Sequence, residues 1–215
     1  YSYDGKNKTS YLFPLVAKYL KPFELDLIVS GDLRQPAKKG ITTKMICENV
    51  TLEDNIKYFD RADYFKELSA LTNLRNTLGL RTAFNTTEKL CNVANSNFAI
   101  TAAFHKPYVE KYHDIFGKNY DNLVILKDVE GAPEFFGKCK YWVKKNGKTV
   151  EYSIDPAEFG INYDKTFENM SLEEALEEIN NPSEDLENLA KLNAAFYLIV
   201  AQKANTIQEA YALIK

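Results

Sequence analysis

The sequence has 215 residues, of which 45% are hydrophobic and 13% aromatic, and its 27 Lys and Arg against 30 Asp and Glu give a net charge of −3. This apolar content excludes an intrinsically disordered chain, and no apolar run approaches the roughly 20 residues of a membrane-spanning helix, so no membrane partner is expected. A pI of 5.6 argues against a protein that is basic over its whole surface, so nucleic acid would have to bind at a local patch.

The first half of the chain is predicted to be mainly helical, with one buried strand. In chain order we expect a helix over 11–20, a strand over 25–29, a short helix over 43–50 and helical residues over 51–78. Thr9 and Ser10 are typical helix caps before the first helix, and Gly79 follows the last helix where a left-handed backbone is favoured.

Strands and helices alternate in the second half. We expect a strand over 97–103, a helix over 108–116, a strand over 122–126, a hairpin of strands over 140–143 and 149–154, and helices from 171, over 186–203 and over 206–214. The hairpin prediction depends on Asn146-Gly147, and the helix from 171 on a capping box of Ser171 and Glu174. No repeat or linker divides the chain, so the sequence predicts a single α/β domain over 1–215 with a mixed, largely parallel sheet.

The cysteines and histidines argue against a disulfide framework and a zinc site. Cys47, Cys91 and Cys139 are odd in number and lie far apart, and the only histidines are His105 and His113. Such cysteines are typical of a reducing, cytoplasmic location. The sequence does not start with Met and has no signal sequence, which we interpret as a fragment of a longer protein.

Two segments are candidates for binding anions. Residues 2–10 form a polar loop with Asp4 and Gly5 that opens a helix, where backbone N–H groups could hold a phosphate. With a single glycine, the same loop is also consistent with a plain capped turn. Arg75 and Arg81 lie around a helix end, where they could bind a carboxylate or phosphate or, alternatively, close the helix and form a surface ion pair.

Two strand ends carry further candidates. Asp128, Glu130 and Glu134 follow one strand and have the oxygen ligands that Mg²⁺ binds, although a solvated acidic loop is the other interpretation. His105 follows another strand and could be catalytic. No Ser, Cys or carboxylate has a spacing that links it to this histidine, so a structural role is favoured.

Five lysines lie within eleven residues, with no acidic residue among them. They are Lys138, Lys140, Lys144, Lys145 and Lys148, with Tyr141 and Trp142 between them. Lysines that meet phosphates, beside an aromatic ring that meets a base, would make a local nucleic-acid site. The other interpretation is a surface hairpin whose lysines protect an exposed edge from aggregation. The stretch 151–187 that follows has twelve carboxylates and one lysine and is interpreted as a solvated helical face.

Three short motifs occur in a fixed order along the chain. They are Arg75-x-x-Leu78-Gly79-x-Arg81-Thr82-x-Phe84-Asn85, Asp155-Pro156-x-Glu158-Phe159-Gly160 and Leu192-Asn193-Ala194-Ala195. In this order and spacing the sequence resembles the anthranilate phosphoribosyltransferase family, also called glycosyl transferase family 3. Ser2-Tyr3-Asp4-Gly5 and His105-Lys106-Pro107-Tyr108 are similar, more narrowly, to its anthranilate-phosphoribosyltransferase-like branch, whose described members bind nucleic acid.

The resemblance implies a fold and an assembly. The fold is the three-layer α/β/α large domain of the family, with 51–78 as a helical remnant that packs toward an amino-terminal helical domain. That helical domain lies outside this chain in the family pattern, and the resemblance implies a homodimer formed through it.

The resemblance also implies that the donor site for phosphoribosyl pyrophosphate has changed. The candidates for substrate and phosphate binding, if the protein is active, are Asp4, Gly5, Ser30, Gly31 and Arg75. Glycines of the phosphate loop are lost, a phosphate-pairing cation has become Asp32, and one of two magnesium carboxylates has become Pro133, which leaves Glu134 with Asp128 nearby.

These changes predict a catalytically degenerate relative, without a cofactor, that binds nucleic acid. The predicted contacts are Lys138, Lys140, Lys144, Lys145 and Trp142. The alternative is an active phosphoribosyl or pentosyl transferase, which would use Mg²⁺ at Glu134 and Asp128 and Arg75 for an unknown aromatic or nucleobase acceptor.

Overall fold

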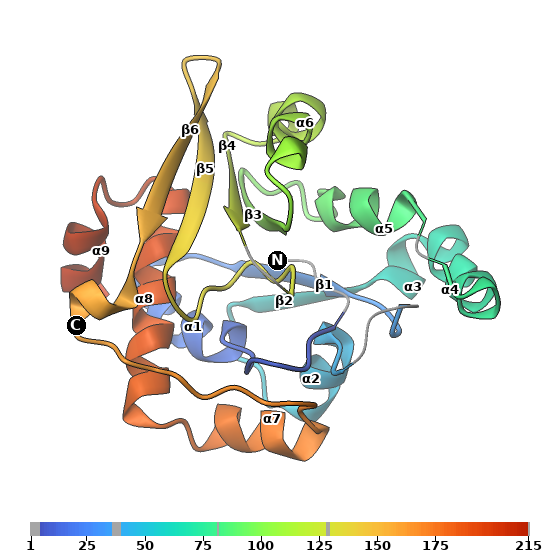
Figure 1. The fold of residues 1–215 in the computed structure, drawn as a ribbon, viewed down its shortest axis with the longest axis horizontal. Helices are drawn as coiled ribbons and strands as arrows, with labels where there is room; N and C mark the ends of the chain where they lie inside the picture. Colours follow the sequence, from blue (N-terminus) through green and yellow to red (C-terminus); the bar gives the residue numbers. More distant parts are fainter. Residues whose placement is uncertain (1–4, 36–39, 81, 128–129, 215) are drawn as a thin grey trace.

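In the part of the chain that the structure describes, the strands form two sheets with helices packed around them. The computed structural model describes residues 5–35, 40–80, 82–127 and 130–214. The strands are β1 (Leu27–Gly31), β2 (Ile56–Asp60), β3 (Phe98–Ala103), β4 (Asn122–Lys127), β5 (Cys139–Lys145) and β6 (Lys148–Ile154). β1 and β2 pair in parallel, and the second sheet has the order β3-β4-β5-β6 (Figure 1).

The helices surround both sheets. The α-helices are α1 (Phe13–Leu20), α2 (Thr43–Asn49), α3 (Arg61–Tyr64), α4 (Lys66–Leu78), α5 (Phe84–Thr87), α6 (Pro107–Phe116), α7 (Leu172–Asn180), α8 (Glu184–Val200) and α9 (Ile207–Ile214). The described residues also form short 3₁₀ helices: η1 (Lys21–Phe23), η2 (Glu88–Leu90), η3 (Gly117–Asn119) and η4 (Pro156–Phe159). α8 and α9 lie on one side of the molecule, α3 and α4 lie at the opposite end, and α6 stands beside the β5–β6 hairpin (Figure 1).

The second sheet is mixed. β3 and β4 are parallel, whereas β4, β5 and β6 are antiparallel neighbours. The β5–β6 turn places Asn146 at φ 50° and Gly147 at φ 74°, the left-handed pair that matches the twist of a two-residue hairpin. The α/β class and the mixed sheet are therefore as the sequence predicts, and the Asn-Gly hairpin is confirmed.

Helix α8 is the centre of the main core. It packs against α1 and α9, and most of its residues are buried, including Leu189, Leu192 and Phe196. A smaller apolar cluster lies between α6 and the second sheet and includes Val109, Leu123 and Trp142. Because α8 lies against both α1 and the loop before β5, it positions the segments that form the candidate site.

Most predicted elements lie within a few residues of the observed ones, but two predictions are wrong. The range 51–78, expected to be helical throughout, contains strand β2 (Ile56–Asp60), which pairs with β1. Thr9 and Ser10 do not cap α1, which begins at Phe13 and has no side-chain cap at Leu12. Gly79 at φ 65° and the Ser171 and Glu174 capping box are observed as predicted.

Among the residues that the structure describes, no helix is both long and apolar enough to cross a membrane.

Candidate functional site

The amino-terminal end of α1 is occupied by a carboxylate from the loop before β5. Oε1 of Glu134 accepts hydrogen bonds from the backbone N–H groups of Leu12 (2.9 Å) and Phe13 (2.7 Å). Oε2 of Glu134 meets the ammonium of Lys6 at 2.8 Å, and both side chains are fully buried. Glu134 thus supplies, from 122 residues away in the sequence, the anion that the positive end of the helix dipole favours.

Lys6 is held by aromatic rings as well as by Glu134. Its Nζ lies 4.8 Å from the ring centroid of Tyr11 and 4.6 Å from that of Phe136. A buried ammonium needs such partners, because leaving it unpaired in the interior is costly. Lys6 was not among the residues singled out from the sequence, where an isolated lysine in a polar loop gives no sign of burial.

The loop before α1 wraps around a second carboxylate, that of Glu130. Its Oε1 accepts from the N–H groups of Asn7 (2.8 Å) and Lys8 (3.1 Å). Its Oε2 accepts from the N–H (3.1 Å) and the hydroxyl (2.8 Å) of Thr9. Successive backbone N–H groups that converge in this way form an anion-binding nest, and here the anion belongs to the protein itself.

Helix α8 fixes the loop that carries both glutamates. The amide of Asn193 accepts from the N–H of Phe135 (3.1 Å) and donates to its carbonyl (2.9 Å), and the hydroxyl of Tyr197 donates to the carbonyl of Pro133 (3.0 Å). Burial, with a contribution from the charge of Glu134, raises the pKa of Tyr197 well above its ordinary value, so its hydroxyl stays a donor. Asn193 belongs to the third sequence motif, and its side chain holds this loop.

The prediction that Glu134 binds magnesium does not agree with these contacts. Two N–H donors and an ammonium already bind its oxygens, and Lys6 lies where a cation would have to approach. Asp128, the second predicted ligand, lies outside the described residues, as does Asp4. The described part of the chain contains no group of three or more His, Cys, Asp or Glu that could hold a metal.

The carboxyl end of β1 is closed by helix α2. A Cβ at Gly31 would lie 3.1 Å from the N of Lys44 and 3.3 Å from the Cβ of Thr43, and Ser30 beside it is buried. Gly5, at φ 134°, is also enclosed, because a Cβ there would lie 3.2 Å from the carbonyl oxygen of Ile41. Gly5, Ser30 and Gly31 were predicted to contact phosphate. In the structure, the two glycines instead allow close packing against neighbouring residues.

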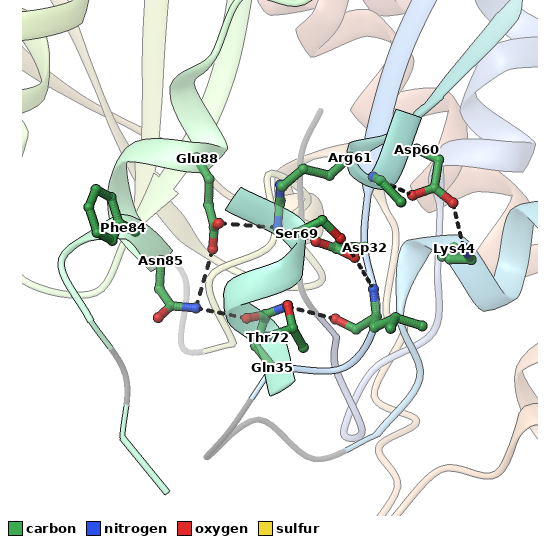
Figure 2. A network of polar contacts seen from close by, with 12 residues as sticks. Asp32, Gln35, Lys44, Asp60, Arg61, Ser69, Thr72, Phe84, Asn85 and Glu88 are labelled. Atoms are coloured by element: carbon green, nitrogen blue, oxygen red, sulfur yellow. Dashed lines mark hydrogen bonds and ion pairs between the residues drawn. The ribbon is translucent and has the colours of Figure 1, made fainter. Parts of the chain in front are cut away.

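A buried polar network lies between β1 and helices α3, α4 and η2 (Figure 2). Arg75 donates through Nη1 to Oε1 of Gln35 (2.8 Å) and to Glu88 (3.1 Å to Oε1). Arg61 lies 3.3 Å from both Glu88 and Asp32. The two arginines and two carboxylates balance in charge, and all four are at most 2% exposed.

Amide and hydroxyl groups complete this network. Gln35 donates to Thr72 (2.9 Å), and Nδ2 of Asn85 donates to Glu88 (3.3 Å) while its Oδ1 accepts from the N–H of Thr82 (2.9 Å). Nε and Nη2 of Arg75 have no hydrogen-bond partner within the described ranges. Arg75, a substrate-binding candidate in the resemblance, is therefore paired with Glu88, which the sequence did not single out.

The predicted lysine patch lies on the β5–β6 hairpin, and part of its charge is neutralised. Lys140 meets Glu151 at 2.6 Å, Lys144 meets Asp114 of α6 at 2.6 Å, and Lys138 lies 3.7 Å from Asp155. Hydrogen bonds from Lys140, Lys106 and Trp142 lower the pKa of Glu151 to about 2, so it stays charged. Lys145, in contrast, makes no ion pair with a described residue and lies over the ring of Tyr152.

Trp142 does not have the role predicted for it. Its side chain is 2% exposed, packs in the cluster beneath α6, and donates through Nε1 to Glu151 at 3.0 Å. A ring with no exposed face cannot stack on a base. Successive residues of β5 point to opposite sides of the sheet, and Trp142 is on the side that α6 covers, which its position between lysines obscured.

The hairpin and α6 together form one basic face. Contacts of Lys106 with Glu151 (3.0 Å) and of Lys144 with Asp114 join the two elements. Residues 105–119 and 138–154 contain eight lysines and three carboxylates, within a chain whose net charge is −3. We call this surface the basic face.

The comparisons with known proteins agree with this fold. The model of a glycosyl transferase family, a/b domain, matches residues 47–215, which is more than half of the chain. The chain therefore belongs to this glycosyl transferase family.

Two curated proteins are similar to this chain in sequence. An uncharacterized protein of Aquifex aeolicus (strain VF5) is 31% identical over 165 residues, which are 76% of this chain and 53% of that protein. The anthranilate phosphoribosyltransferase of Caldicellulosiruptor saccharolyticus is 28% identical over 168 residues, which are 74% of this chain and 49% of the enzyme. The chain spans about half the length of these curated relatives.

Solved structures show the same fold at low sequence identity. The anthranilate phosphoribosyltransferase of Thermus thermophilus matches with a TM-score of 0.70 at 18% identity, covering 98% of this chain and 69% of that one. The Saccharomyces cerevisiae enzyme in complex with PRPP and Mg matches with a TM-score of 0.74 at 13% identity, covering 98% and 65%. This chain thus has the fold of the large domain of anthranilate phosphoribosyltransferase.

Proposed function

We propose that this protein is a non-catalytic member of its family that binds nucleic acid. One observation supports the non-catalytic role: Glu130 and Glu134 accept hydrogen bonds from the N–H groups of the loop 7–9 and of the α1 amino terminus. These are the groups that a pyrophosphate bound at this loop would need.

The internal carboxylates disfavour phosphoribosyl pyrophosphate, the compound written PRPP in the description of the yeast structure, for two reasons. They are part of the chain, so they compete with any free phosphate at a high effective concentration. A displaced glutamate would also stay close to the incoming phosphates, where like charges repel.

The chemistry of phosphoribosyl transfer would lack its cation as well. Mg²⁺ offsets phosphate charge in such reactions, but Glu134 is bound to Lys6, and the described residues do not fit a metal.

The basic face supports the second half of the proposal. Lys118, Lys145 and Lys148 are exposed and form no ion pair with a described residue, so they can meet phosphates without breaking an existing contact. Lys138, Lys140 and Lys144 contribute less, because each has a carboxylate within 4 Å.

Calorimetry and an anisotropy titration test the proposal together. We expect no heat when PRPP and Mg²⁺ are added to the protein, and we expect binding of a fluorescent oligonucleotide at low salt. Micromolar binding of PRPP that Glu134→Ala abolishes would contradict the non-catalytic role. Failure to bind any oligonucleotide would contradict the nucleic-acid role.

The alternative function is a pentosyl transferase acting on an aromatic or nucleobase acceptor. The Nε and Nη2 atoms of Arg75, buried without a described hydrogen-bond partner, are the observation that favours it. It requires that an acceptor carboxylate replace Glu88 on Arg75, so Glu88→Gln should then improve acceptor binding rather than only weaken the fold.

A further inference from the structure

A row of aromatic rings runs from the end of β3 along helix α6. Ring centroids are 4.6 Å apart for Phe104 and His105, 6.4 Å for His105 and Tyr108, 6.3 Å for Tyr108 and Tyr112, and 6.4 Å for Tyr112 and Phe116. Tyr108, Tyr112 and Phe116 are four residues apart and so share one face of the helix. We call these five residues the aromatic ladder.

The first rings of the aromatic ladder are open to solvent. Phe104 is 58% exposed and Tyr108 is 47% exposed, although large aromatic side chains normally bury most of their area. Lys111 lies 5.7 Å from the ring centroid of Tyr108, where it adds a positive charge beside the ring. Tyr112 and Phe116 are half-buried against the cluster beneath α6, so the exposed rings of the ladder are Phe104, His105 and Tyr108. Exposed rings beside a cation are an unusual surface for a protein to keep without a ligand.

The ladder borders a cavity of about 370 Å³. One wall is made by Phe104, His105, Tyr108 and Tyr112, and polar residues of the segment 82–89, including Thr86 and Lys89, make another. This volume suits a ligand about the size of a nucleotide, and rings with a few polar groups are the usual lining of such sites. Glu130 also lines the cavity, but its oxygens are already bonded to the loop 7–9.

We propose that the aromatic ladder stacks the unpaired bases of a single-stranded nucleic acid, with one base entering the cavity. The inference rests on the proposed nucleic-acid function and gives it a site and a strand preference. The basic face adjoins the ladder, because both use α6, and its excess of lysines complements the phosphate backbone.

The geometry selects single strands over duplexes. In a duplex the faces of the bases are covered by their neighbours, so rings on a protein surface cannot reach them. In a single strand every base has a face that an aromatic side chain can cover, with little preference for sequence. The hairpin lysines can hold the backbone of either form, whereas the ladder can act only on unpaired bases.

Fluorescence anisotropy with three probes tests the inference. The probes are oligo(dT) and oligo(rU) of about 15 nucleotides, a length that one binding surface of this kind covers, and a DNA duplex of equal length. We expect Phe104→Ala and Tyr108→Ala each to weaken binding of single strands about fivefold or more, with duplex binding changed less than about twofold. Tyr108→Phe keeps the ring and should keep the affinity.

Phe65→Ala is the matched control, because Phe65 is 42% exposed and lies between α3 and α4, outside the ladder. Its affinity for each probe should equal that of the wild type, and circular dichroism should show the same fold for all variants. If Phe104→Ala and Tyr108→Ala weaken the binding of single strands and duplex equally, or weaken neither, the aromatic ladder does not stack unpaired bases. Either result would leave the proposed function intact. A wild-type protein that binds none of the three probes would overturn both.

Discussion

Lys6, Arg61 and Arg75 are buried, and each meets a carboxylate of the same chain. Their partners are Glu134, Glu88 and Asp32, which are themselves at most 1% exposed. A buried ion pair adds little stability compared with an apolar pair of the same shape, but removing one partner leaves a charge without compensation. These pairs therefore restrict which side chains can replace the three cations and their carboxylates.

Removal of the Glu88 charge should destabilise the protein strongly. Glu88→Gln keeps the shape of the side chain but removes the carboxylate that Arg75 contacts, while Asp32 still contacts Arg61, so we expect a loss of about 3 to 5 kcal/mol in the free energy of unfolding. Urea denaturation measures it.

Glu53→Gln is the control for this change. Glu53 pairs at 3.5 Å with Lys21, which is exposed, and such surface pairs contribute at most about 1 kcal/mol. A loss at Glu88 no larger than that at Glu53 would show that the arginines find other partners.

At the scale of elements, helix α6 is joined to the second sheet by polar contacts as well as by its apolar face. His113 is buried, and its ring nitrogens contact the carbonyl of Leu123 on β4 (3.1 Å) and the hydroxyl of Thr149 on β6 (3.4 Å). With the pair of Lys144 and Asp114, these contacts hold α6 against the hairpin, so the aromatic ladder and the basic face are joined.

The protonation of His113 should weaken this junction. Burial lowers the pKa of His113 below its ordinary value of 6.5, the charge of Lys144 lowers it further, and the Leu123 carbonyl and Asp114 act in the opposite direction. The unfolded chain therefore binds the proton more readily, and stability is lost as the pH falls below about 6.5.

His113→Gln removes this titration and should reduce the loss of unfolding free energy between pH 7.5 and pH 5.5, measured by urea denaturation. His105→Gln, at the exposed histidine, should keep the wild-type difference between the two pH values. The same pH dependence in all three proteins would mean that another group is responsible.

Across the whole molecule, charge is separated between the basic face and the rest of the chain. Eight lysines and three carboxylates lie in 105–119 and 138–154, so the remaining residues carry the acidic excess. The net charge of −3 is therefore a poor guide to what this surface attracts, because the field near a ligand is set by the closest charges at physiological ionic strength.

Binding of nucleic acid should depend on salt through the basic face. The double variant Lys145→Glu and Lys148→Glu should weaken single strands and duplex alike, and should lower the slope of log affinity against log salt by about 1 to 2, since each lost phosphate contact removes about 1.

The double variant Lys18→Glu and Lys203→Glu changes the net charge equally at exposed lysines outside the basic face and should keep the wild-type slope. If both double variants lower the slope equally, binding follows net charge rather than this surface.

The sequence by itself determined the features that depend on neighbouring residues. Asn146-Gly147 specifies a tight hairpin, Ser171 with Glu174 specifies a helix start, and Gly79 specifies a helix end, because each acts within a few residues of itself. The alternation of strands and helices gave the α/β class for the same reason.

Only the tertiary structure decided the contents of the site. The carboxylate at the start of α1 comes from Glu134, the hairpin lysine Lys144 is neutralised by Asp114 of α6, and Trp142 is covered by the helix above it. Each of these contacts joins segments that are distant in the chain, and nothing local specifies the partner. A charge or a ring acquires its role from what the fold packs against it, so residues that look like ligand contacts in the sequence can be partners of the protein itself.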